Sequence, residues 1–130
     1  MAALYAGLDG GGTKTAVCLT DGGGRERASF TAPGISYTGA PAPAVDAVLT
    51  QIFRELLALC GAEPLSAVCV CAAGVSRPDV PGRIRAAAQA SGYTGPLRIE
   101  GDHVGALAGA LGASTGVILL SGTGSICYGR

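Results

Sequence analysis

The order of apolar and polar positions predicts three β-strands at the start of the chain. Residues 4–8, 15–20 and 25–30 are short segments, and the first two are rich in apolar residues. They are separated by Asp9–Lys14 and Asp21–Gly24, each of which contains a run of three glycines. Short segments bounded by glycine-rich linkers are typical of strands joined by tight turns. We therefore expect an antiparallel meander of three strands.

The spacing of apolar residues then changes to that of an α-helix. Apolar residues recur every three or four positions across residues 45–57, and Gly61 is expected to end this helix. A second helix is predicted at about residues 80–91, with Asp79 as its cap and Gly92 at its end. Two helices therefore follow the meander.

The remaining segments complete an α/β order. Residues 67–73 form an unbroken apolar run, which is typical of a strand covered on both faces. A short strand is predicted at 97–100, a helix of small residues at about 103–111, and a β-hairpin at 117–128. The order βββαβαβα, with a mixed sheet that contains three parallel strands, resembles that of a ribonuclease H-like lobe.

Two glycine-rich loops carry hydroxyl side chains and follow predicted strands. The first is Asp-Gly-Gly-Gly-Thr-Lys-Thr at 9–15, and the second is Ser-Gly-Thr-Gly-Ser at 121–125. Glycine lets the backbone approach an anion and turn N–H groups toward it. The first loop matches neither the Walker A pattern nor the dinucleotide fingerprint, and both loops run into strands. One such loop alone would fit an ordinary turn, but two of them on either side of Asp102 indicate a clamp for nucleotide phosphates.

Four segments carry a resemblance to a known family. They are Leu8–Thr15, Ala73–Asp79, Gly101–Ala108 and Ile118–Ile126, and they occur in the family's order. With these segments the chain resembles the sugar kinase, Hsp70 and actin superfamily, and within it the BadF/BadG/BcrA/BcrD ATPase family, which includes the N-acetylglucosamine kinases. The first segment would also fit the related ROK sugar kinases.

The resemblance implies two similar lobes that share one ATP site. Residues 1–112 would form the first, ribonuclease H-like lobe, and residues 113–130 would be the first β-hairpin of a second lobe. Because the second lobe normally supplies the adenine site, we expect the chain to be part of a longer protein and inactive alone. The hairpin would then lack its own sheet and pair with another chain, so a homodimer is expected.

The resemblance also assigns roles to the candidate site residues. Asp102 would be the catalytic base that accepts the proton of the sugar hydroxyl, although capping a helix is a simpler role for it. Asp9 would hold Mg²⁺, with a plain turn as the alternative. The residues expected to bind the phosphates of ATP are Gly10, Gly11, Gly12, Thr13, Lys14, Gly122, Thr123, Gly124 and Ser125.

The segment after the third strand is expected to bind the acceptor. N-acetylglucosamine kinases usually carry an Asn here, in a Gly-x-Ser-x-Asn or Gly-x-Ser-Asn context, whereas this chain reads Gly-Ile-Ser-Tyr-Thr-Gly at 34–39. The candidate substrate residues are Ser36, Tyr37, Thr38 and Asp102. The leading function is ATP-dependent phosphoryl transfer to a sugar or amino-sugar hydroxyl. The alternatives are an ATPase activator of a 2-hydroxyacyl-CoA dehydratase or benzoyl-CoA reductase, and a non-catalytic ROK-type sugar sensor.

The net charge and the cysteines limit the classes of binding partner and the cellular compartment that we expect for this protein. Nine acidic and nine basic residues in a chain of 130 give zero formal net charge, which leaves no basic footprint for nucleic acid or an acidic membrane. The uncharged stretch 103–129 is interrupted by glycine, serine and threonine, so it is not predicted to span a membrane. The five cysteines, with Cys69 and Cys71 on one face of a strand, are interpreted as buried small hydrophobes in a reducing compartment. With no recognisable signal peptide, a cytoplasmic protein is expected.

Overall fold

The computed structural model describes most of the first hundred residues and two short segments beyond them. The described residues are 3–11, 13–37, 40–72, 77–100, 117–120 and 126–129. For Glu100 and for the last two segments the description covers the backbone alone.

Seven strands and two helices are found within these ranges. In chain order they are β1 (Leu4–Gly10), β2 (Lys14–Asp21), β3 (Glu26–Pro33), α1 (Ala42–Cys60), β4 (Leu65–Ala72), α2 (Val80–Ala90), β5 (Leu97–Glu100), β6 (Val117–Leu120) and β7 (Ile126–Gly129). Every predicted strand and both predicted helices that fall within the described residues are confirmed. The predicted helix at 103–111 lies outside those residues.

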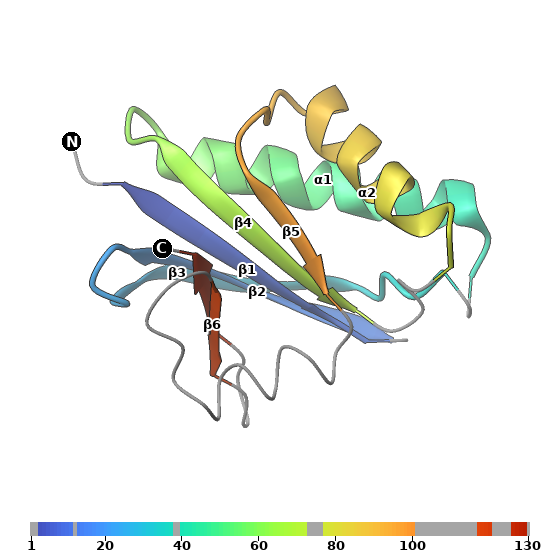
Figure 1. Ribbon diagram of the computed structural model, residues 1–130, viewed down its shortest axis with the longest axis horizontal. Coiled ribbons are helices and arrows are strands. Elements are labelled where there is room, and N and C mark those ends of the chain that lie inside the picture. The colour runs from blue at the N-terminus through green and yellow to red at the C-terminus, as the bar shows by residue number, and fades with distance from the viewer. Residues whose placement is uncertain are drawn as a thin grey trace.

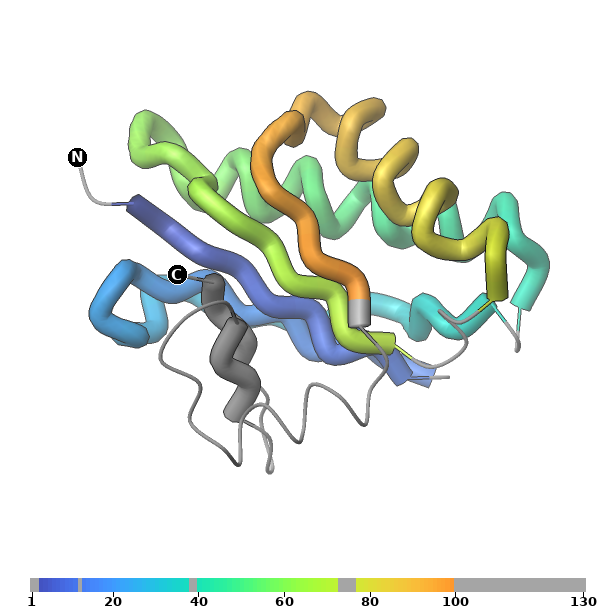
Figure 2. The backbone as a smooth tube through the Cα atoms, viewed as in Figure 1, coloured from blue at the N-terminus to red at the C-terminus, as the bar shows by residue number. Residues whose placement is uncertain are grey.

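The first five strands form one mixed sheet in the order β3-β2-β1-β4-β5. β1, β2 and β3 are antiparallel neighbours, whereas β4 is parallel to both β1 and β5. Figure 2 shows β1 in blue and β4 in green at the middle of the sheet, with β5 in orange at one edge. The predicted meander and the three parallel strands are therefore confirmed.

The main core lies between the sheet and the two helices, which cover the same face (Figure 1). On α1 the buried residues recur at helical spacing, as the apolar pattern predicted. Phe53 and Leu49 of α1 are fully buried, and Ile84 of α2 packs into the same cluster. The strands contribute every second side chain to this cluster: Leu4, Ala6 and Leu8 from β1, Val17 and Leu19 from β2, and Val68, Val70 and Ala72 from β4.

Both helices end at the predicted glycines. Gly61 follows α1 with φ of 59°, and Gly92 lies just beyond α2 with φ of 102°, a backbone conformation that side chains disfavour. Asp79 does occupy the position before α2, but its side chain makes no capping hydrogen bond. Its carboxylate instead forms ion pairs with Arg77 and Arg83, which compete for the oxygens that a cap would use.

The segments after residue 112 form the predicted hairpin, since β6 and β7 are antiparallel and Leu120 pairs with Ile126. β7 contacts β1, β4 and β2 but is not hydrogen-bonded into their sheet. The hairpin therefore lies across the sheet face opposite α1 and α2, as Figure 1 shows. Whether residue 112 divides two lobes stays a prediction.

Among the cysteines whose side chains the structure describes, all are buried: Cys18, Cys60, Cys69 and Cys71. The Sγ atoms of Cys69 and Cys71 are 3.6 Å apart, as expected for residues two apart on one strand face. No cluster of three or more metal-ligating side chains occurs among the described residues. Within the same residues, neither helix has the length and apolar character needed to cross a membrane.

Candidate functional site

The candidate binding loops lie at one end of the sheet, beyond the last residues of its parallel strands. Because β1, β4 and β5 are parallel, they end together, with Gly10 opposite Ala72 and Glu100 opposite Cys71. β3 ends at the same edge, where Pro33 pairs with the first residue of β2. Ligand sites in open α/β sheets lie at the carboxyl ends of parallel strands. This edge is therefore the candidate site.

A tight turn between β1 and β2 forms one wall of the site. The Gly11 N–H donates to the carbonyl of Lys14 over 2.9 Å, which closes the hairpin. Thr13 and Lys14 are exposed, so both side chains face solvent where a phosphate could reach them. We call this connection, described at Gly11 and Thr13, the glycine turn. The prediction of a hairpin tip is confirmed, whereas phosphate binding stays a prediction.

Glycine is required at position 10 for a steric reason. Gly10 is buried, and a Cβ placed there would lie 2.3 Å from Cγ1 of Ile35 and 3.2 Å from the Cβ of Ala72. The Ile35 N–H also donates to the carbonyl of Gly11 over 3.2 Å. The residues that follow β3 are therefore seated directly on the glycine turn. We call Gly34–Tyr37 the acceptor segment, after its predicted role.

Asp9 is the carboxylate placed next to this turn. It is half-buried at the end of β1, and it pairs with Ala16 and Cys71 on the sheet face opposite the helices. Magnesium in phosphoryl-transfer sites is held by one or two carboxylates, with phosphates and water completing the shell. A single carboxylate beside a hydroxyl-bearing glycine turn is a donor set that fits this ion.

Tyr37 is tied to the helices rather than open to solvent. Its ring is 5% exposed, and its hydroxyl donates to Oδ1 of Asp46 on α1 over 2.5 Å. Burial and this hydrogen bond to a carboxylate raise the pKa of the Tyr37 phenol, since both disfavour the phenolate. Ser36 is buried beside it. Both were predicted to bind the acceptor, and that role stays a prediction.

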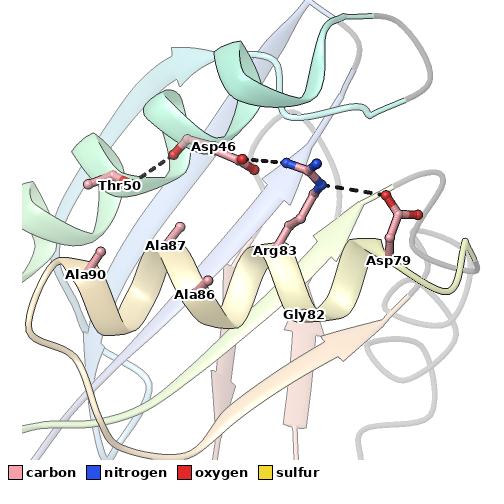
Figure 3. Close-up of a pocket in the computed structure, with 8 residues that line it drawn as sticks. All are labelled: Asp46, Thr50, Asp79, Gly82, Arg83, Ala86, Ala87 and Ala90. Carbon is pink, nitrogen blue, oxygen red and sulfur yellow. Dashed lines mark hydrogen bonds and ion pairs between the residues drawn. The ribbon is translucent and has the colours of Figure 1, made fainter.

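A network of charged residues surrounds Tyr37 and was not predicted from the sequence. Arg83 of α2 donates to Oδ2 of Asp46 over 2.7 Å and lies 3.6 Å from Asp79. Arg77 lies 3.7 Å from Asp79 and donates to the carbonyl of Tyr37 over 3.1 Å. Figure 3 shows Arg83 between the two carboxylates, at the end of a groove of about 540 Å³ between α1 and α2. The groove is lined by Asp46, Thr50, Asp79, Gly82, Arg83, Ala86, Ala87 and Ala90.

Several predicted site residues lie outside the described part of the chain. They are Gly12, Thr38, Asp102, Gly122, Thr123, Gly124 and Ser125. Asp102 follows the end of β5 by two positions in the sequence, and the second glycine loop joins β6 to β7. Their roles stay predictions.

The mixed sheet and its glycine turn define the class of protein. This strand order, with both helices on one face, is the α/β lobe shared by ribonuclease H-like folds and the sugar kinase and actin-like ATPases, so the predicted fold class is confirmed. The chain belongs to the BadF/BadG/BcrA/BcrD ATPase family, whose pattern it matches over residues 6–130.

Three proteins similar to this chain carry the names of amino-sugar kinases. An N-acetylmuramic acid/N-acetylglucosamine kinase of Clostridium acetobutylicum is 32% identical over 126 residues, which are 95% of this chain and 41% of that protein. The chain thus spans less than half the length of this relative. A proposed N-acetylglucosamine kinase of Porphyromonas gingivalis has the same fold, with a TM-score of 0.68 at 23% identity over 95% of this chain and 44% of its own. A second one, from Chromobacterium violaceum, has a TM-score of 0.61 at 24% identity over 97% of this chain and 44% of its own.

Proposed function

We propose that the protein containing this chain transfers the γ-phosphoryl group of ATP to a hydroxyl of an amino sugar or hexose, in the manner of an N-acetylglucosamine kinase. Membership of an ATPase family supports the use of ATP. The amino-sugar kinase of C. acetobutylicum supports the class of acceptor. The main observation in support of the proposal is that the acceptor segment contacts the glycine turn, through the hydrogen bond from Ile35 to Gly11.

The hydrogen bond from Ile35 to Gly11 would hold the nucleotide loop and the acceptor loop together at the same end of the sheet. Phosphoryl transfer requires the two substrates to meet in this way. Catalysis of this reaction depends mainly on positioning and on neutralising phosphate charge. Thr13 and Lys14, both exposed at the glycine turn, would contact the phosphates from one side. The second glycine loop, at 121–125, would contact them from the other.

Asp9 would hold Mg²⁺ at the carboxyl end of β1. Its carboxylate would keep the ion beside the glycine turn, and the chemistry supplied by the ion, when bound, would be neutralisation of phosphate charge. The half-buried position of Asp9 favours this role over that of a freely solvated turn residue. Among the described side chains no further metal ligand is required, because magnesium keeps much of its water shell.

Asp102 would act as the general base. Its carboxylate would accept the proton of the attacking sugar hydroxyl as the new O–P bond forms and ADP leaves. It follows β5, which ends at the candidate site. This assignment agrees with the general position of active-site groups beyond parallel strands.

The proposal is tested by measuring ADP release from the full-length protein with a panel of amino sugars and hexoses. We expect turnover with at least one of them. Slow ATP hydrolysis that no sugar stimulates would contradict a sugar kinase and favour the activator of a dehydratase or reductase.

The role of Asp102 is tested with Asp102→Asn, which keeps the shape and removes the base. We expect kcat to fall by at least about 10²-fold with little change in ATP affinity, the usual scale for a general base. Asp21→Asn is the matched control, because Asp21 pairs with Leu4 at the opposite end of the sheet. A wild-type kcat in Asp102→Asn would exclude the base assignment.

A further inference from the structure

The acceptor segment is held at both of its ends by different parts of the fold. At one end, Ile35 packs where Gly10 lacks a side chain and bonds to Gly11. At the other end, Tyr37 is bound through two groups: its hydroxyl donates to Asp46, and its carbonyl accepts from Arg77. The segment therefore links the glycine turn to the helix pair.

The contacts at the Tyr37 end form a closed ring of side chains. Asp46 accepts from the tyrosine hydroxyl on one oxygen and from Arg83 on the other. Arg83 then reaches Asp79, Asp79 pairs with Arg77, and Arg77 returns to the carbonyl of Tyr37. Figure 3 shows the Arg83 guanidinium between Asp46 and Asp79. The planar guanidinium holds its donors in a rigid arrangement, whereas the donors of a lysine ammonium rotate freely on a flexible stem.

The side chains of this ring are partly exposed, so we expect the ring to affect local geometry more than the stability of the fold. The side chains of Arg83, Asp46 and Asp79 are 39%, 34% and 51% exposed. Ion pairs at such exposure contribute little to the free energy of folding. Together with the packing of Tyr37 in the core, these contacts connect the acceptor segment to α1 and α2.

We propose that Arg83 and Asp46 are positioning residues that set the affinity for the acceptor by orienting Gly34–Tyr37, without touching the acceptor themselves. This proposal rests on the proposed function of the site. The glycine turn is closed by its own hydrogen bond from Gly11 to Lys14, which is independent of the ring. Loss of the ring should therefore loosen acceptor binding and leave nucleotide binding almost unchanged.

The kinetic test uses Arg83→Met and Arg83→Lys in the full-length protein. Arg83→Met removes the charge but keeps the length, and it should raise the acceptor KM by about tenfold while kcat and the ATP KM stay within about twofold, the pattern of lost ground-state positioning. Arg83→Lys keeps the positive charge but loses the planar two-sided geometry of the guanidinium, so its acceptor KM should lie between those of the wild type and Arg83→Met. If Arg83→Met instead lowered kcat by about as much and left the acceptor KM unchanged, the proposal would be overturned.

The matched control is Arg85→Met on the same helix. Arg85 is exposed, and its hydrogen bond to the carbonyl of Leu97 involves no member of the ring. Its kinetic constants should equal those of the wild type. If Arg85→Met raised the acceptor KM as much as Arg83→Met does, the effect would be general to α2 and the ring would have no special role.

A second measurement separates this proposal from the proposed function. Hydrogen exchange of a peptide covering residues 34–37 should be faster in Arg83→Met than in the wild type, and unchanged in Arg85→Met, because only the first variant releases Asp46, the partner of the Tyr37 hydroxyl, from Arg83. This holds whether or not any sugar is turned over. Unchanged exchange in Arg83→Met would overturn the positioning role even if the protein proved to be a sugar kinase.

Discussion

At the scale of single residues, the sequence located some site residues and missed others. The glycine turn was predicted because three glycines stand between two strand signals. Asp46 and Arg83 were not, because they are 37 positions apart in sequence and neither lies in a recognisable pattern. A contact between two helices has no local signature, so only the folded arrangement brings this pair to Tyr37.

The steric role of Gly10 leads to a prediction about stability. Gly10→Ala would place a methyl group against Ile35 and Ala72, so the free energy of unfolding should fall by about 1–3 kcal/mol, the usual cost of overpacking a core. Denaturant unfolding followed by circular dichroism measures this. In a double-mutant cycle, Gly10→Ala should cost less in the Ile35→Ala background than in the wild type, because the smaller side chain makes room for the methyl group.

Gly82→Ala is the control for that substitution. An added Cβ at Gly82 meets nothing within 4 Å, and the residue lies in the first turn of α2. The change should be neutral or slightly stabilising. Equal destabilisation by both variants would show that the contact with Ile35 does not set the requirement for glycine at position 10.

The buried thiol of Cys18 leads to a prediction about pH. Burial, with added repulsion by nearby Glu26 and a hydrogen bond that the thiol donates to the Glu26 carboxylate, raises its pKa from 9.0 to about 11. A folded-state pKa above the unfolded value means that the fold favours the protonated thiol. Its contribution to stability is therefore complete below pH 9.0 and is lost as the pH rises toward 11.

This pH dependence is measured by denaturant unfolding across the alkaline range. The free energy of unfolding should decline above about pH 9, and Cys18→Ala should flatten part of the decline, since that thiol no longer titrates. An identical alkaline profile for the variant and the wild type would show that Cys18 is not the source.

At the scale of elements, strand and helix order followed from periodicity, whereas element ends did not. β1 and β3 run further than predicted, to Gly10 and Pro33, because ladder pairing with β2 extends them past the last apolar residue. α1 begins at Ala42, before its apolar stripe, with a proline in its first turn. Proline fits there because the first N–H groups of a helix lack partners. These ends depend on neighbours and on caps rather than on hydrophobic spacing.

The end of α2 provides an element-scale prediction. Gly92 has φ of 102°, and a Cβ there would meet Leu57 at an ordinary 3.9 Å, so the obstacle to a side chain is the backbone alone. Gly92→Ala should lower the free energy of unfolding by about 1–3 kcal/mol. Gly22→Ala, in a turn without positive φ and with 3.7 Å to its nearest atom, should cost much less in the same thermal or denaturant melt. If the two costs were equal, backbone strain at Gly92 would not be the cause.

At the scale of the whole molecule, the family resemblance predicted more than the spacing of apolar residues could. Periodicity predicted the mixed sheet and the hairpin, and both are confirmed. It could not predict that β7 would lie across β1, because this contact joins segments more than a hundred residues apart.

The hairpin leads to a prediction for the 130-residue chain on its own. β6 and β7 form a separate two-stranded sheet, an arrangement that is marginally stable in water and leaves edges for another chain. We expect the isolated chain to be dimeric or larger and without kinase activity, as measured by light scattering and ADP release. Residues 1–112 alone should associate less. A stable monomer that phosphorylates sugar at millimolar ATP would contradict this expectation and the division into two lobes.

The hydrogen bond from Ile35 to Gly11 also bears on how the two substrates would influence each other. A nucleotide that ordered the glycine turn would also order the acceptor segment bonded to it. The sugar would then have less conformational entropy to overcome, so it would bind more tightly to the nucleotide complex than to the free protein. Linkage requires the sugar to strengthen nucleotide binding by the same factor. A single backbone contact would thereby favour the ternary complex over either binary one, and would limit wasteful hydrolysis of ATP when no sugar is present.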